Sequence, residues 1–288
     1  MSFGLRLKKF VKNFLFDRKA YQFFIRDWVA LGDISRAADV LSTMRFSRNL
    51  EPIERDGPKA KRIVVLAPHP DDEIIGPGGT IIRAIDRGAD VLTVYLTSGM
   101  PNEMAQRREE TEAVAEVVGF QTKFLNMPAF HIQVDSESMS NLVDGIKSHS
   151  PDVIFIPFFL DDHDDHRRAN ELFWRAFKSD LLPGGLEVWA YQVYSVLPPG
   201  VVVDITDVSE RKAEAIRGWP SQFKSRDWVH FSLGLNAFNS RFIKEKSDPR
   251  FAEVFFVLPV QDYVDLCAIY FGDDASSCYY APSYLKKS

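Results

Sequence analysis

The chain has 288 residues, of which 45% are apolar and 26% charged, the composition of an ordinary globular protein with room for one large α/β domain and an extension. Its net charge of −5 is unevenly spread, because residues 1–62 carry 14 Lys and Arg against 7 Asp and Glu while the remainder is acidic. An acidic body lacks the basic footprint of a nucleic-acid-binding protein, and no apolar run is long enough to predict a transmembrane helix.

Residues 1–60 are predicted to form a helical extension. Apolar residues recur at helical spacing between basic residues in the segment 1–20, and two further helical runs reach residue 44. We expect the extension either to pack on the main domain or to make peripheral contact with an anionic membrane through residues 1–20. Lysines interrupt the apolar residues of the N-terminus, which argues against a signal peptide. Residues 50–61, with two prolines and many charges, are predicted to link the extension to a domain spanning 61–288.

The domain from residue 61 onward alternates strands and helices. Strands are predicted at 63–67, 91–96, 123–125, 153–157, 187–196, 201–204 and 251–258, and helices at 79–87, 103–118, 138–148, 167–178, 208–217 and 227–246. Near-continuous apolar strands separated by helices indicate an α/β fold, with a Rossmann-like, mostly parallel sheet and helices on both faces. Such sheets bind ligands at the carboxyl ends of the strands, where the strand order reverses.

The two cysteines, Cys267 and Cys278, are too few for a disulfide framework. We therefore expect a reducing, cytoplasmic compartment, with a single bridge between the two as the alternative. Neither cysteine lies near the polar motifs of the chain, so a metal site there would use other ligands.

The first polar motif runs from Pro68 to Glu73 and directly follows the apolar residues 63–66. Charged groups at the end of a buried strand are costly to desolvate unless something compensates them, and a divalent metal would do so. His69 and Asp72 are three residues apart in a turn, so both side chains can approach one ion, while Asp71 points elsewhere. The alternative is a polar helix N-terminus in which the acidic residues favour the helix dipole.

The second motif, residues 161–166, reads Asp-Asp-His-Asp-Asp-His and follows another predicted strand. Zinc takes histidine nitrogens and carboxylate oxygens, and a catalytic zinc site combines three protein ligands with an open water position. His69, Asp72 and one of His163 and His166 supply such a set, and the spare carboxylates can act as a base or hold a ring nitrogen. The alternative is a solvated acidic loop that caps the next helix.

These motifs resemble those of the LmbE-like, or PIG-L, family of zinc-dependent N-acetylglucosaminyl deacetylases. The family's Ala-His-Pro-Asp-Asp-Glu motif stands here as Pro68 to Glu73, with Pro68 for Ala, and its His-x-Asp-His motif stands as His163 to His166. Further landmarks are Thr97-Ser98-Gly99, Arg107 to Glu110, Val118-Gly119, Lys212 to Gln222 and Phe251 to Phe255. The resemblance covers about residues 62–258 and implies the removal of an acetyl group from an amino sugar.

The resemblance also implies a role for each matched residue. Three residues would bind zinc, or another divalent metal such as Fe²⁺: His69, Asp72 and His166. Asp71 would be the general base, and protonated His163 would be the acid or electrophile opposite the metal, oriented by Asp165. Arg107 would contact the substrate. Glu73 has no implied role.

One departure from the family bears on substrate recognition. Many members have Leu-Pro-Asp-Gly after the third strand, where this chain has Met127-Pro128-Ala129-Phe130. Ala129 therefore replaces an Asp, and recognition of the sugar is expected to differ if that Asp holds a sugar hydroxyl in relatives. The acidic residues Asp161 and Asp162 are also expected to affect what approaches the site.

Three functions are compatible with the sequence. The first is a zinc amidohydrolase acting on an N-acetylated amino sugar that is free, conjugated or lipid-linked. The second is a metal-dependent hydrolase of another amide or of a phosphoester, although two metals would favour the phosphoester and the sequence offers one full ligand set. The third is a non-catalytic binding module on the same fold. The expected partner is a small molecule or glycan, without nucleic acid.

Overall fold

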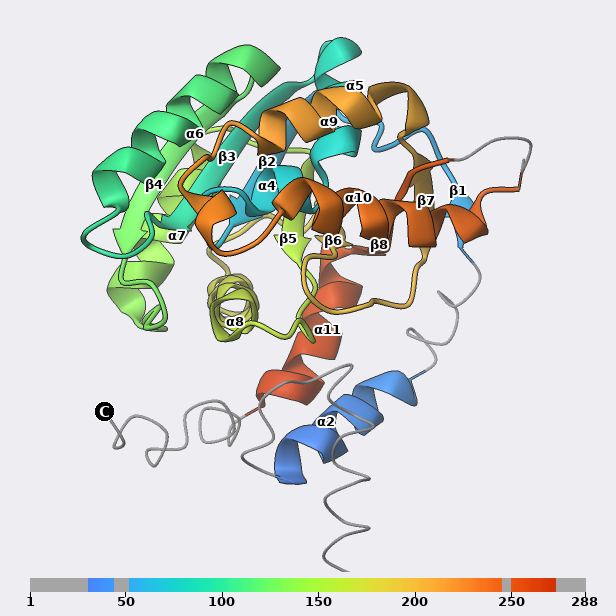
Figure 1. Cartoon of the computed structure of the whole chain (residues 1–288). Coiled ribbons are helices and arrows are strands. Elements are labelled where there is room, and N and C mark those ends of the chain that lie inside the picture. The colour runs from blue at the N-terminus through green and yellow to red at the C-terminus, as the bar shows by residue number, and fades with distance from the viewer. Residues whose placement is uncertain (1–30, 44–51, 245–249, 273–288) are drawn as a thin grey trace, which may run out of the picture.

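A computed structural model describes residues 31–43, 52–244 and 250–272 of the chain (Figure 1). Most of the predicted extension, including the basic segment 1–20, lies outside these residues, as does Cys278. Within the described ranges, no helix is both long enough and apolar enough to cross a bilayer.

Eight strands of the described residues form one sheet, in the order β1-β7-β8-β6-β5-β2-β3-β4 (Figure 1). The strands are β1 Ile53–Glu54, β2 Arg62–Ala67, β3 Asp90–Thr97, β4 Gln121–Met127, β5 Val153–Pro157, β6 Glu187–Tyr191, β7 Val201–Asp204 and β8 Ala252–Pro259. Strand β8 pairs antiparallel with both β6 and β7, and the other pairs in this sheet are parallel. The predicted α/β fold with a mostly parallel sheet is confirmed.

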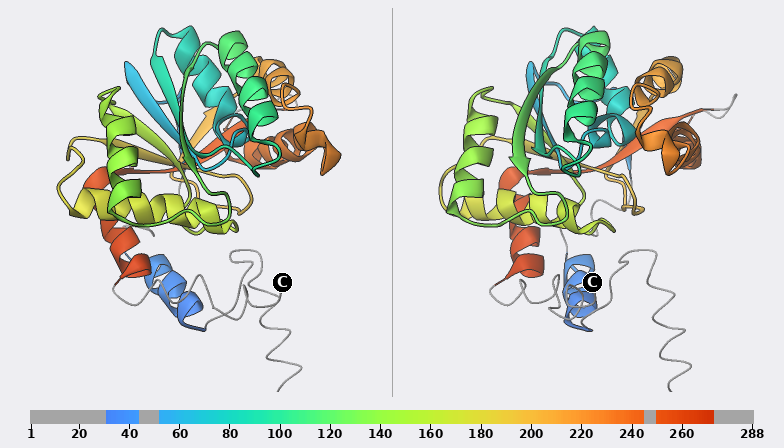
Figure 2. Two further views of the ribbon diagram at one scale, coloured as in Figure 1. Left: turned by 90° about the vertical axis from the view of Figure 1, so that its left-hand side faces the viewer. Right: turned by 60° about the vertical axis from the view of Figure 1, so that its left-hand side comes forward.

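Helices cover both faces of the sheet (Figure 2). The α-helices are α2 Leu31–Leu41, α4 Asp72–Ile75, α5 Gly78–Asp86, α6 Met104–Val118, α7 Ser136–Lys147, α8 Asp164–Lys178, α9 Ser209–Ile216, α10 Trp228–Asn239 and α11 Val260–Phe271. Short 3₁₀ turns are η1 Thr206–Val208, η2 Gln222–Lys224 and η3 Ser240–Phe242. Apolar side chains of α7, α8 and α11 pack on one face, and those of α4, α5, α6, α9 and α10 pack on the other.

Strand β2 shows why the sequence forms this central sheet. Ile63 and Val65 point into the core under α4 and α5, while Val64 and Leu66 point into the core under α7 and α8. All four side chains are fully buried. A strand covered on both faces needs an apolar residue at every position, which explains the unbroken aliphatic run before the first polar motif.

Several elements differ from the sequence-based expectation. Strand β4 is longer than predicted, and α10 ends at Asn239 rather than near residue 246. Helix α11 packs against α8 and α2 and was not predicted; its exposed side carries the apolar residues Ala268 and Ile269, which weakens the amphipathic contrast. Its Cys267 is fully buried. Strand β1 pairs with β7 inside the stretch that was predicted to be a linker.

The polar motifs lie where the strand order of the sheet reverses. Strand β2 pairs with β3 on one side and with β5 on the other. The chain leaves β2 for α4 on one face of the sheet and leaves β5 for α8 on the opposite face. The carboxyl ends of β2 and β5 therefore form the topological switch point at which α/β sheets bind ligands.

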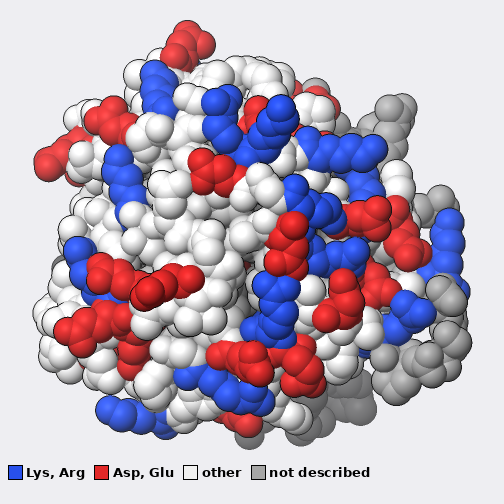
Figure 3. Space-filling view, turned by 90° about the horizontal axis from the view of Figure 1, so that it is seen from above, with Lys and Arg blue, Asp and Glu red and all other residues white. Residues whose placement is uncertain are grey.

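The face seen from above Figure 1 carries a mixture of charges. Figure 3 shows Lys and Arg side chains interspersed with Asp and Glu over this face. Opposite charges at such spacing screen one another, so this face presents no extended potential of a single sign.

Candidate metal centre and active site

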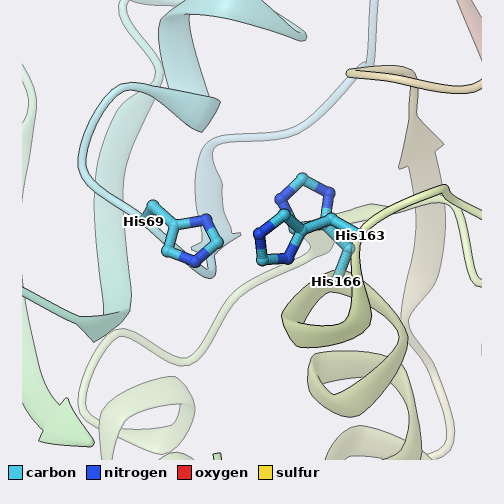
Figure 4. Close-up of side chains that lie close together, drawn as sticks. All are labelled: His69, His163 and His166. Atoms are coloured by element: carbon cyan, nitrogen blue, oxygen red, sulfur yellow. The ribbon is translucent and has the colours of Figure 1, made fainter. Parts of the chain in front are cut away.

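Three histidines from two distant segments converge at the switch point (Figure 4). His69 lies in the turn after β2, one turn before α4 begins at Asp72. His163 is the N-cap of α8, and His166 lies in the first turn of that helix. One nitrogen from each ring lies within 4.8 Å of the others. The fold thus joins the two motifs that the sequence separates by almost a hundred residues.

A single carboxylate oxygen links two of these rings. The Nδ1 of His69 and the Nε2 of His166 each lie 3.2 Å from Oδ2 of Asp72. The three residues are buried, and the Nε2 of His166 makes no hydrogen bond among the described residues. A buried ring nitrogen without a hydrogen bond, facing a carboxylate, suits a cation placed between them. The donors therefore fit a metal held by His69, Asp72 and His166.

A second carboxylate contacts the other nitrogen of each of these histidines. Asp165 Oδ2 lies 2.9 Å from His69 Nε2, and Asp161 Oδ1 lies 3.1 Å from His166 Nδ1. Burial acts to lower the pKa of both rings, but the neighbouring carboxylates raise it to about 9 for His69 and to about 10 for His166. The site therefore favours positive charge, and carboxylates in this position orient histidine ligands in metal sites.

His163 differs from its neighbours in both charge and partners. Its Nδ1 accepts a hydrogen bond from the backbone N–H of Asp165 at 3.1 Å, so a neutral ring carries its proton on Nε2. Burial, and then repulsion by His69 and His166, lower the pKa of His163 to about 3. A neutral His163 presents this Nε2–H as a donor, and the expected role of a protonated His163 opposite the metal stays a prediction. Asp165 contacts the two histidines through different groups. Its carboxylate contacts His69, whereas its backbone N–H contacts His163.

Asp71 has an unusual backbone and a buried cationic partner. Its φ of 116° lies in the left-handed region that non-glycine residues rarely adopt. Arg107 Nη2 donates to Asp71 Oδ2 at 3.0 Å and also to the carbonyl of Pro70. Gly99 makes room for this arginine, because a Cβ there would lie 2.7 Å from its Cδ. Burial raises the pKa of Asp71 to about 7, although the Arg107 cation acts to lower it.

Arg107 was expected to contact substrate, and the structure assigns it a different partner. Its side chain is almost fully buried, and the guanidinium contacts the predicted base. Contact between Arg107 and substrate stays a prediction, whereas its contact with Asp71 is observed.

Glu73, which has no role implied by the sequence, supports Asp71. Its Oε2 accepts the backbone N–H of Asp71 at 3.0 Å, and its Oε1 accepts the hydroxyl of Tyr95 at 2.6 Å. Burial raises the pKa of Glu73 to about 8, even though the Tyr95 hydrogen bond acts to lower it. The sequence signal for this contact was Tyr95, a polar hydroxyl within the apolar strand β3. The sequence does not show which residue that hydroxyl contacts.

Asp161 was named with Asp162 as able to change what approaches the site, and the structure places Asp161 inside the protein. The residue is fully buried. Its Oδ2 accepts the backbone N–H groups of Tyr194 and Ser195, and its Oδ1 accepts that of His163. Asp161 therefore braces His166 from within the protein.

Comparison with known proteins identifies the family. Residues 64–177, which include both polar motifs, match the family model described as PIG-L, GlcNAc-PI de-N-acetylase. The diacetylchitobiose deacetylase of Thermococcus kodakarensis is 31% identical over 214 residues, which cover 66% of this chain and 78% of that relative. The chain belongs to the PIG-L family.

Two further relatives extend this comparison. A structure of N,N′-diacetylchitobiose deacetylase from Pyrococcus horikoshii matches with a TM-score of 0.61 and 28% identity, covering 71% of this chain and 86% of that one. The 4-oxalmesaconate hydratase of Pseudomonas putida is 25% identical over 186 residues, covering 54% of this chain and 72% of the hydratase. The chain is thus related both to deacetylases and to a hydratase.

The deacetylase relatives confirm the predicted enzyme class, a hydrolase of amide bonds. Among the described residues, a histidine group that could hold a metal ion is present; it consists of His69, His163 and His166, of which His163 was not among the predicted ligands. The choice of zinc and the roles of the individual residues stay predictions.

Proposed function

We propose that this PIG-L protein is a zinc-dependent N-deacetylase that hydrolyses the acetamide of an N-acetylated amino sugar. The observation that carries the proposal is the arrangement of three kinds of group at one switch point. These groups are a buried histidine–carboxylate donor set, a carboxylate with a pKa of about 7 and a neutral imidazole donor. Amide hydrolysis needs an activated water, a proton acceptor and a group that stabilises the oxyanion.

His69, Asp72 and His166 would hold the metal, which when bound supplies Lewis-acid activation of water and of the amide carbonyl. Asp71 accepts a proton from the attacking water, because a base with a pKa near the working pH is both available and strong enough. His163 donates its Nε2–H to the carbonyl oxygen as that atom gains negative charge. Asp71 then gives the proton to the amide nitrogen, and acetate and the free amine leave.

The proposed substrate class is an N-acetylhexosamine that is free, conjugated or lipid-linked. The support is the name of the T. kodakarensis relative, which acts on diacetylchitobiose, together with the match to a GlcNAc-PI de-N-acetylase model. N,N′-Diacetylchitobiose is therefore the first probe, beside N-acetylglucosamine, a nucleotide sugar and a lipid-linked N-acetylated sugar.

The test combines metal content with acetate release. We expect purified protein to carry a divalent metal by elemental analysis and to release acetate from at least one member of this panel. Metal-loaded protein that releases no acetate from any of them would contradict the proposal.

Hydration of an unsaturated acid is a second candidate, favoured by the P. putida relative. Such a reaction also adds an activated water, so the same donor set would serve it. Loss of ultraviolet absorbance from 4-oxalmesaconate, with no acetate release from the sugar panel, would favour hydration over deacetylation.

A further inference from the structure

Phe130 is an aromatic residue placed at the site in a conformation that aromatic residues rarely adopt. Its φ of 63° lies in the left-handed region, which glycine adopts far more readily than a residue with a side chain. Its side chain is nevertheless 53% exposed, so burial of the ring does not compensate for the unfavourable backbone. An unfavourable conformation that persists without such compensation often reflects function.

The metal-site residues hold this backbone in place. The N–H of Phe130 donates to Asp165 Oδ2 at 2.7 Å, and the same oxygen lies 2.9 Å from His69 Nε2. The Phe130 ring lies 5.5 Å from the ring of His163 and 6.4 Å from that of His69, measured between centroids. The position of the aromatic ring is therefore coupled to the position of the histidine cluster.

A second partly exposed aromatic ring lies beside His163. Tyr194 is 36% exposed, and its ring centroid lies 5.8 Å from His163 and 5.5 Å from His166. Phe130 instead contacts His163 and His69. His163, which would polarise the substrate carbonyl, therefore lies between two aromatic rings. Phe130 lies on the side of His69, and Tyr194 lies on the side of His166.

We propose that Phe130 is a stacking residue that binds the C–H face of the pyranose ring carrying the acetamide. This inference rests on the proposed function. The pyranose C2 is two bonds from the carbonyl carbon, so an acetamide held at His163 brings the sugar ring into the neighbourhood of Phe130. Pyranoses with equatorial hydroxyls expose an apolar C–H face, and flat aromatic rings are suited to pack on it.

The decisive variant is Phe130→Gly, because it removes the ring and at the same time allows the left-handed backbone. We expect folding stability and metal content to be retained, while the KM for N,N′-diacetylchitobiose rises about tenfold with little change in kcat. A purely structural role for Phe130 would instead lower stability and leave KM unchanged.

Three further variants sharpen the test. Phe130→Tyr keeps a flat ring and should keep the KM, whereas Phe130→Leu keeps apolar bulk without a flat face and should raise it. Ser150→Gly is the matched backbone control, since Ser150 also has a positive φ of 47° but precedes β5 at the opposite edge of the sheet. It should leave KM unchanged. A wild-type KM in either the Phe130→Leu or the Phe130→Gly protein would overturn the proposal.

A binding measurement separates this inference from the proposed function. Calorimetry with N,N′-diacetylchitobiose on metal-loaded Asp71→Asn protein, in which turnover is expected to be blocked, gives Kd directly. A Kd that weakens about tenfold on adding Phe130→Gly supports stacking even if the wild type releases no acetate. Acetate release by the wild type with a Kd independent of Phe130 would retain the proposed function and reject the stacking role. A sugar that does not bind at all would also reject it.

Discussion

Single residues of this site differ in protonation because their surroundings differ. Burial raises the pKa of Asp71 to about 7, although the Arg107 cation acts to lower it. His163 is buried beside two other histidines, and its pKa falls to about 3. Near neutral pH one group can accept a proton while the other donates a hydrogen bond from a neutral ring. Pairs of groups whose environments separate their pKa values in this way supply the acid and base of many active sites.

The first prediction concerns the base. Asp71→Asn removes the proton acceptor but none of the proposed metal ligands, so turnover should fall about 10²- to 10⁴-fold at unchanged metal content. Acetate release and elemental analysis measure the two quantities. His69→Ala is the comparison, because it should lose the metal itself. Turnover of Asp71→Asn close to that of the wild type would remove Asp71 from the base role.

The second prediction concerns Arg107. Its cation lowers the pKa of Asp71, so Arg107→Met should raise that pKa further and move the acidic limb of the pH–kcat profile to higher pH. The activity of Arg107→Met should therefore be lower than that of the wild type near neutral pH and should partly recover at alkaline pH. Arg108→Met is the matched control on the same helix, since Arg108 contacts Asn126 and Phe124 instead. If Arg107→Met instead changes KM and leaves the pH profile unchanged, the result would support the predicted contact between Arg107 and substrate.

Among the elements, α4 matters because its first turn sets the direction of the proposed base and of one proposed metal ligand. Asp71, the N-cap of this helix, has a left-handed backbone. A non-glycine residue in that conformation is disfavoured by about 1–3 kcal/mol and persists where neighbours fix it. Glu73 accepts the N–H of Asp71 while Arg107 holds its carboxylate.

The third prediction follows from this support. Glu73→Leu leaves the N–H of Asp71 and the hydroxyl of Tyr95 without their partner, so it should lower kcat and cost about 1–3 kcal/mol of stability per group. Glu73→Gln can still accept from Asp71 and can donate to Tyr95, so it should restore most of the activity. Thermal unfolding and kcat distinguish the two variants. A Glu73→Gln protein as impaired as Glu73→Leu would mean that these two hydrogen bonds are not what Glu73 supplies to the site.

The fourth prediction concerns the start of α5, which a buried ion pair holds in place. Glu253 accepts the N–H groups of Gly79 and Thr80 at 2.7 and 2.8 Å, and Lys212 Nζ lies 2.7 Å from the same carboxylate. Lys212→Met leaves a buried carboxylate uncompensated and should cost about 3–5 kcal/mol of unfolding free energy.

The control for this prediction is Arg211→Met on the same helix. Arg211 pairs with Asp86 at the surface, where both side chains are almost half exposed. Such a pair contributes about 0–1 kcal/mol, so the variant should unfold close to the wild type. Equal stability losses in denaturant for Lys212→Met and Arg211→Met would show that burial of the Glu253 pair is not what stabilises α5.

At the scale of the whole molecule, the proposed metal site lies between two segments that leave the sheet on opposite faces. The donors come from the loop after β2 and from the start of α8 after β5, on opposite faces of the sheet. Without a cation, the buried carboxylates Asp71, Asp72, Asp161 and Asp165 share a small volume with three histidines. A metal bound there stabilises the native state alone, because the unfolded chain does not hold these ligands together.

The fifth prediction is that a chelator lowers the thermal midpoint of unfolding. At a metal concentration 100 times the Kd, binding contributes about 2.7 kcal/mol, so its removal should be visible by calorimetry. Re-addition of zinc should restore the midpoint, and His69→Ala protein should respond to neither treatment. A chelator that removes the metal without moving the wild-type midpoint would show that the site is not coupled to folding.

The sequence by itself determined the parallel α/β sheet, the two polar motifs and the family resemblance. These features depend on residues close together in the sequence. An aliphatic run such as 63–66 indicates a strand buried on both faces of the sheet, and His69 to Asp72 lie within a single turn. The sequence-based prediction missed α11, where the apolar residues Ala268 and Ile269 on the exposed side weaken the amphipathic contrast.

Only the tertiary structure decided which partner each polar group has. Asp165 contacts His69, Asp161 contacts His166, and Glu73 supports Asp71 through contacts that no spacing in the sequence encodes. The protonation of His163 follows from burial and from two histidine neighbours, one of them 94 positions away along the chain. Distances between segments set these interactions, because electrostatic and hydrogen-bond energies depend on separation in space rather than along the chain.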